Sequence, residues 1–111
     1  MRQADDVAWF TFHDLCEGPC SHVDYMELAS WFHTLIVSEV PCFNETSENT
    51  ARRLISLVDV LYDHNVNLIV SAAAPPHEVY RGAKLKSEFQ RTVSRLVEMQ
   101  TEPYLARPHR P

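Results

Sequence analysis

Thr34-Leu35-Ile36-Val37 is a continuous run of apolar and β-branched residues, and Pro41 follows it four residues later. Short runs of this kind are typical of strands buried on both faces of a parallel sheet. Proline has no N–H to donate to a neighbouring strand, so we expect the strand to end before Pro41. The run therefore predicts a sheet that is covered by helices.

The segments on either side repeat the order of a strand followed by a helix. Residues 7–12 and 66–70 are rich in β-branched and aromatic residues, which predicts two more strands. Connections that contain helices join parallel strands, so the sequence predicts a three-layer α/β fold with about three parallel strands. The sequence predicts helices over 21–32, 51–63 and 86–100, with Ser21 in a capping box and with Phe89, Val93, Leu96 and Val97 facing inward on the last helix. It predicts a loop over 13–20, a left-handed residue at Asn65 and a short helical turn from Pro75-Pro76 to Gly82. Residues after 103 are expected to be only partly ordered.

Gly18 and Gly82 are the only glycines among the 111 residues. A P-loop needs two glycines five positions apart before Lys and Ser or Thr, and a dinucleotide-binding fingerprint needs three within six residues. The chain therefore has no glycine-rich phosphate cradle. No apolar run approaches the ~20 residues of a membrane span, residues 1–20 lack a signal-peptide pattern, and the three cysteines are an odd number. We expect a cytoplasmic protein without a transmembrane segment.

Charge is distributed unevenly along the chain. The formal net charge is −5, which argues against nucleic acid as a partner. Residues 1–83 carry 12 acidic and 4 basic residues, whereas residues 84–111 carry 6 basic and 3 acidic ones. The basic C-terminal region is either a surface for a partner or a helix that faces an acidic neighbour within the domain.

Four residues of the types that bind zinc fall within ten positions: His13, Cys16, Cys20 and His22. Their spacing is not that of a common zinc knuckle, and ordinary thiols with surface histidines explain them equally well. The sequence contains neither His-Glu-x-x-His nor Gly-x-Ser-x-Gly. We therefore assign no metal ligand and no catalytic residue.

Four arginines and one serine are candidates for phosphate binding. Arg52 and Arg53 are expected in the first turn of a helix, where positive charge opposes the helix dipole and an anionic partner would compensate. Arg91 and Arg95 lie one turn apart on the last helix, and they either bind phosphate or pair with glutamates three residues away. Ser71 follows a predicted strand, at the edge where α/β sheets place ligands, and it either orients a water or phosphate or caps the next turn.

The chain resembles the C-terminal part of the ZapE-type ATPases in an unbroken series of segments between residues 7 and 105. Cys20 departs from the family pattern, which has a basic residue there, and Ser87 stands where an aromatic residue is common. Because Cys20 is not basic, the charge contact that the family makes in the first loop is not implied for this chain. The missing aromatic ring at Ser87 is expected to loosen the start of the last helix. The matching segments are 7–16, 18–19, 24–25, 32–41, 51–63, 67–72, 88–100 and 104–105.

The resemblance implies part of an AAA+-like P-loop ATPase that hydrolyses ATP with Mg²⁺. The bacterial family associates with the division-ring protein FtsZ at the inner face of the membrane, and mitochondrial relatives act in protein quality control. The Walker A and B segments would lie upstream of Val7, so we expect residues 1–105 to be the C-terminal portion of such a domain and 106–111 a Pro-rich tail. The resemblance therefore implies a partial P-loop-type domain, and we expect this domain alone to bind no ATP or Mg²⁺ and to be inactive.

The resemblance also bears on the arginines and on the partners. Arg52, Arg53, Arg91 and Arg95 match family arginines, so at least one is expected near ATP or at a subunit interface, and the interface role would require a homo-oligomer. The rest of the ATPase domain is then the first expected partner. The alternative is a non-enzymatic module that docks a protein through its basic C-terminal helix.

Overall fold

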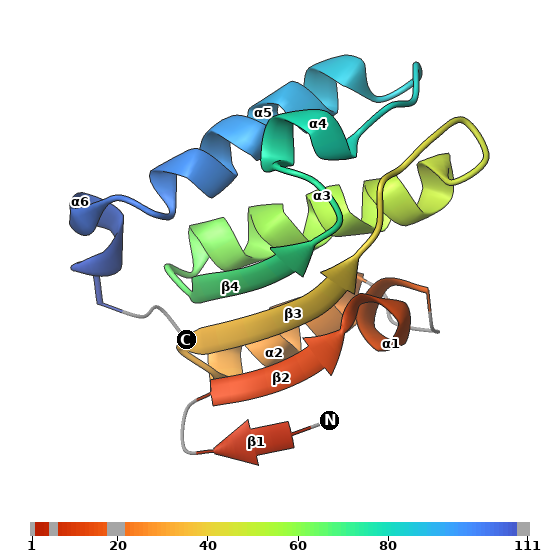
Figure 1. The fold of residues 1–111 in the computed structure, drawn as a ribbon. Helices are drawn as coiled ribbons and strands as arrows, with labels where there is room; N and C mark the ends of the chain where they lie inside the picture. Colours follow the sequence, from red (N-terminus) through yellow and green to blue (C-terminus); the bar gives the residue numbers. More distant parts are fainter. Residues whose placement is uncertain (1, 5–6, 18–21, 109–111) are drawn as a thin grey trace.

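The computed structural model describes residues 2–4, 7–17 and 22–108, and its sheet has the strand order β1-β2-β3-β4 (Figure 1). β2 (Val7–Thr11), β3 (Thr34–Val40) and β4 (Asn67–Ala72) are parallel, which confirms the predicted α/β fold. β1 (Arg2–Ala4) pairs antiparallel with β2 and was not predicted, because three residues carry too little pattern. The helices are α1 (Phe12–Cys16), α2 (His22–Trp31), α3 (Glu48–Asp63), α4 (Pro76–Val79), α5 (Lys86–Glu98) and α6 (Glu102–Leu105).

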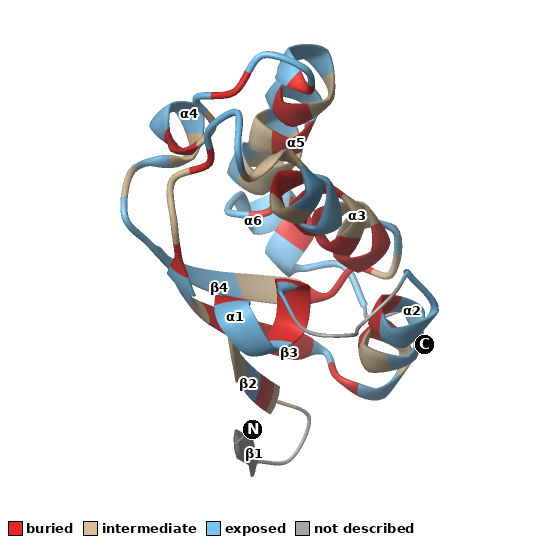
Figure 2. Cartoon of the chain, turned by 90° about the vertical axis from the view of Figure 1, so that its right-hand side faces the viewer, coloured by how far each residue is buried: buried red, intermediate tan, exposed pale blue. Residues whose placement is uncertain are grey.

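The crossover helices gather on one side of the sheet (Figure 2). Right-handed crossovers that advance in one direction along a sheet leave their helices on the same face. Leu35 and Val37 point to this helical face and are fully buried. On the opposite face the register aligns Trp9, Ile36 and Ile69, and Trp9 and Ile69 keep 40% and 56% of their surface exposed. Burial of the 34–37 run is therefore greater on the helical face.

Several predicted boundaries were wrong. The expected loop over 13–20 contains α1, which Thr11 caps by accepting a hydrogen bond from the backbone N–H of Asp14. α3 begins at Glu48 rather than at residue 51, so its arginines lie in the second turn, away from the positive end of the helix dipole. Val97 is 57% exposed and does not face the core. The predicted capping box at Ser21 lies outside the described residues.

β3 contains a bulge near its carboxyl end. Val37 pairs with Val70 and Val40 with Ala72, so two residues of β3 lie opposite one residue of β4. Glu39, inside the bulge, has a φ of 62°, in the left-handed region. Asn65, after α3, has a φ of 54°, which confirms its predicted left-handed position.

The beginning of α3 is tied to the segment before α5 by a group of residues that we call the Glu48 cluster: Glu48, Tyr80, Gly82, Lys84 and Leu85. One Glu48 oxygen accepts a 2.5 Å hydrogen bond from Tyr80 Oη, and the other accepts a 2.9 Å bond from the backbone N–H of Lys84. The Leu85 N–H donates to Tyr80 Oη at 2.7 Å. These bonds hold the pKa of Glu48 below its usual value, chiefly through Tyr80.

Candidate functional site

The two arginines of α3 have different surroundings. Arg53 donates from Nη1 to the carbonyl of Cys16 at 3.0 Å, so it caps the last turn of α1. Arg52 is exposed and makes no hydrogen bond or ion pair with the residues that the structure describes. Arg53 therefore has a structural role, whereas the guanidinium of Arg52 is available to a ligand or a partner.

The two arginines of α5 bind an acidic residue of α3. Arg95 Nη1 donates to Asp59 Oδ1, and its guanidinium lies 4.8 Å from the centre of the Tyr62 ring. Arg91 Nη2 lies 3.6 Å from Asp59 Oδ2. The Arg95 side chain is 27% exposed and the Arg91 side chain 58%. Arg95 is thus held between the two helices, and Arg91 is bound more loosely at the surface.

Within the described structure, Arg91 and Arg95 do not pair with the glutamates three residues away on their own helix, which was one of the two interpretations of their sequence. Glu98 accepts a hydrogen bond from Tyr62 Oη at 2.7 Å and lies 3.8 Å from Arg107. Tyr62 also stacks on Tyr104, with ring centres 5.8 Å apart. The interhelical contacts of Arg95 and the Glu98–Arg107 pair neutralise part of the basic C-terminal region, which agrees with a helix that faces an acidic neighbour within the domain.

Tyr104 anchors α6 to the rest of the domain. Its ring is buried, Oη donates to the carbonyl of Val66 at 2.7 Å, and the carbonyl oxygen of Leu61 lies 3.3 Å from Oη. Burial raises the pKa of the Tyr104 hydroxyl far above that of free tyrosine. Neither α6 nor this anchoring role of Tyr104 was predicted, because three prolines after residue 102 suggested a loosely ordered end.

The candidate residues do not converge on one site. Arg53 and Asp59 are six residues apart on α3, which is about 9 Å along the axis, so the two arginine pairs bind at separate places. Ser71 is exposed at the carboxyl end of β4, on the sheet face that carries Ile69. No group of three or more metal-binding side chains occurs among the described residues.

The residues considered for zinc have other contacts in the described part of the chain. His13 Nδ1 lies 2.6 Å from Glu17 Oε2, and this hydrogen bond raises the pKa of His13. His22 Nδ1 lies 2.8 Å from Ser56 Oγ on α3, and Cys16 is buried. Cys20 lies outside the described residues.

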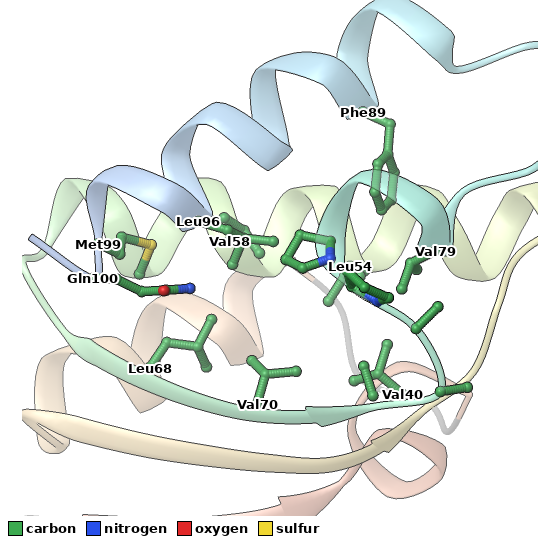
Figure 3. Close-up of a pocket in the computed structure, with 15 residues that line it drawn as sticks. Val40, Leu54, Val58, Leu68, Val70, Val79, Phe89, Leu96, Met99 and Gln100 are labelled. Carbon is green, nitrogen blue, oxygen red and sulfur yellow. The ribbon is translucent and has the colours of Figure 1, made fainter.

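An apolar cavity of about 500 Å³, which was not predicted from the sequence, lies between β4 and the helices α3, α4 and α5 (Figure 3). A signal for it was present in the run of small residues and prolines over 72–76, which cannot fill space at the end of a strand. The cavity is lined by Val40, Leu54, Val58, Leu68, Val70, Ala72, Ala73, Ala74, Pro75, Pro76, Val79, Phe89, Leu96, Met99 and Gln100. Within the described ranges, every helix is too short or too polar to cross a bilayer.

Parallel strands with crossover helices define an α/β domain of a kind compatible with part of a P-loop-type ATPase. A family model described as AFG1-like ATPase matches residues 1–108, and the chain belongs to this family. No solved structure matches the chain.

Curated relatives are similar over most of the chain. The Cell division protein ZapE of Escherichia coli is 48% identical over 99 residues, which are 89% of this chain and 26% of that protein. An uncharacterized protein of Schizosaccharomyces pombe is 42% identical over 79 residues, covering 71% of this chain and 17% of its own length. Lactation elevated protein 1 homolog B of Danio rerio is 31% identical over 135 aligned positions, covering 93% and 27%. The chain spans about a quarter of the length of ZapE.

Proposed function

We propose that this chain serves as the C-terminal portion of an ATPase that hydrolyses ATP with Mg²⁺, and that alone it does not turn over ATP. The observation that carries the proposal is the AFG1-like ATPase match over residues 1–108. The chain's own residues do not fit a complete ATP–Mg²⁺ site, because it has no glycine-rich loop and its described part has no cluster of metal-binding side chains. In this proposal residues 106–111 form a tail, and the chain contributes side chains to a site built elsewhere.

Arg52 is the residue that we propose for the nucleotide or a subunit interface. Arg53 binds the α1 carboxyl end, and Arg91 and Arg95 bind Asp59, which leaves Arg52 as the exposed arginine of the four without such a contact in the described structure. A guanidinium can stabilise the charge that develops during phosphoryl transfer, including from a neighbouring subunit. Ser71 is proposed only as an accessory group that orients a water or phosphate.

The test replaces the matching 99-residue stretch of E. coli ZapE with this chain and compares ATP hydrolysis by the chimera and its variants. Arg52→Ala is expected to lower kcat by about 10³-fold, as removal of a transition-state arginine does. Arg91→Ala, which also removes an exposed arginine, is the matched control and is expected to leave kcat within about twofold. Equal rates for both variants would show that Arg52 has no such role, and turnover by the isolated chain would contradict its proposed inactivity.

We further propose a cell-division setting, with FtsZ as a partner at the inner face of the membrane. Support comes from the name of the E. coli relative, Cell division protein ZapE, and it is limited to that protein. Co-sedimentation of the chimera with FtsZ polymers tests this proposal, and a chimera that stays in the supernatant under conditions where ZapE pellets would contradict it.

The alternative is a protein-docking module that uses the basic α5 region. Lys84, Lys86 and Arg91 are exposed and would supply the positive surface, whereas Arg95 is already bound to Asp59. A Lys84→Glu, Lys86→Glu double variant distinguishes this alternative, because it should abolish partner binding without changing ATP hydrolysis by the chimera.

A further inference from the structure

β4 is an edge strand with an open side. It pairs with β3 along one edge, and within the described residues no strand pairs with its other edge. Natural edge strands are usually protected by charged residues or proline, but the sequence of β4, Asn-Leu-Ile-Val-Ser-Ala, contains neither. The outer N–H and C=O groups of β4 are therefore positioned to pair with another extended chain.

The apolar cavity lies beside this strand. Leu68 and Val70 extend from β4 toward the helices, and Leu96 and Met99 of the α5 region lie across from them (Figure 3). None of the residues that line the cavity is charged, and Gln100 supplies the only polar side chain among them. An occupant that complements this lining is uncharged and apolar.

From these two features we propose that β4 binds an extended, uncharged apolar segment of a partner polypeptide, which adds as a strand and places alternate side chains in the cavity. Strand addition joins main-chain hydrogen bonds at the edge to pockets for every second side chain, and both elements meet here. An acyl chain would fill the cavity without supplying donors and acceptors to the edge. A charged segment would lose its hydration against a lining that offers no counter-ion.

The chain contains its own control for this proposal. Ile69 and Val70 are neighbours on β4, and both are partly exposed, at 56% and 42%. Successive side chains of a strand point to opposite faces, so Val70 lines the cavity while Ile69 points away from it. A lysine at either position adds the same charge to the same strand, but only Lys in place of Val70 puts that charge in the proposed site.

The experiment measures binding of a fluorescein-labelled peptide of alternating Thr and Val to the full 111-residue chain, by fluorescence anisotropy. Val70→Lys is expected to raise the Kd at least about tenfold, and Ile69→Lys less than about twofold. Circular dichroism establishes that both variants fold. Two further peptides carry N-methyl groups on one or the other alternate set of amides, because alternate N–H groups face opposite edges of a strand. The peptide methylated on the amides that face β4 should not bind the unaltered chain, whereas the peptide methylated on the other amides should still bind it.

Other occupants give different results. Equal effects of the two lysine variants, or equal effects of the two N-methylated peptides, would overturn the proposal. So would binding of decanoate without binding of peptide. Concentration-dependent dimerisation that Val70→Lys abolishes, with no peptide binding, would assign the edge to a second copy of the chain and would also overturn it.

Discussion

Replacing Gly82 with alanine tests the packing of the Glu48 cluster. A Cβ at residue 82 would lie 2.5 Å from Glu48 Oε1 and 2.7 Å from Tyr80 Oη, whereas ordinary contact begins at 3.4 Å. Relief would require Glu48 Oε1 to move by about 0.9 Å, the difference between those distances. Glu48 Oε1 is the oxygen that accepts the 2.5 Å hydrogen bond from Tyr80 Oη, so a shift of that size away from residue 82 would disturb this bond. The new methyl group therefore cannot be accommodated without disrupting the cluster.

Overpacking of this kind costs about 1–3 kcal/mol. The lower entropy of alanine in the unfolded chain offsets about 0.4–1 kcal/mol of that cost. We therefore expect Gly82→Ala to lower the free energy of unfolding by about 1.5 kcal/mol. With a urea m-value of about 1.5 kcal/mol/M for a domain of this size, the unfolding midpoint should fall by about 1 M.

Urea unfolding followed by tryptophan fluorescence and circular dichroism measures this shift. A Glu48→Ala background supplies the control, because it removes the carboxylate that the new Cβ would approach most closely. In that background Gly82→Ala should have a smaller effect, by the logic of a double-mutant cycle, although the 2.7 Å approach to Tyr80 Oη remains. A loss below about 0.5 kcal/mol in the wild-type chain, or an equal loss in both backgrounds, would refute the reasoning.

Five further variants test other contacts, each by urea unfolding. The pKa of Glu48 is lowered in the folded state, so the stability that it contributes is present above its ordinary pKa and is lost as the pH falls; Glu48→Gln should flatten the decline below about pH 5. Arg95→Ala should cost about 1–2 kcal/mol and Arg91→Ala less than about 0.5, because only Arg95 is held over Tyr62; equal costs would contradict this difference. Tyr104→Phe should lower the free energy of unfolding by about 1–2 kcal/mol near neutral pH, through loss of the donor to the Val66 carbonyl. It should also reduce the decline in stability above about pH 10, because the raised pKa of Tyr104 opposes ionisation in the folded state. Unchanged stability both near neutral pH and above about pH 10 would count against the anchor. Glu39→Gly should stabilise the chain by about 0.5 kcal/mol because glycine adopts a positive φ without strain, whereas destabilisation would show that the Glu39 side chain is needed.

The main elements were predictable because their signals are local. The apolar run at 34–37 and the helical stripe over 51–63 each identify an element from a few neighbouring side chains. The five-residue helix α1 was missed in a segment rich in loop formers, although Phe12, Leu15 and Cys16 have the spacing of a helical face. That spacing is the sequence signal for α1.

The surroundings of the candidate residues were not predictable in the same way. Arg95 and Asp59 are 36 positions apart, and Arg53 and Cys16 are 37 apart, so their contacts depend on how the elements pack. The open edge of β4 was hidden for a related reason. The residues of 66–70 predict a strand but not its position in the sheet, and only the strand order places it at an edge.

Because of the bulge in β3, the number of residues in this strand determines which face of the sheet Val40 points to. In an uninterrupted strand Val40 would share a face with Ser38, but the extra residue turns Val40 toward the cavity, opposite Ala72. Deleting Glu39 would therefore turn Val40, the last residue of β3, to the opposite face of the sheet, whereas substituting Glu39 would leave Val40 in place. Because residue 39 has a positive φ, relatives of this chain should favour glycine or asparagine at this position and should accept neither a gap nor an insertion.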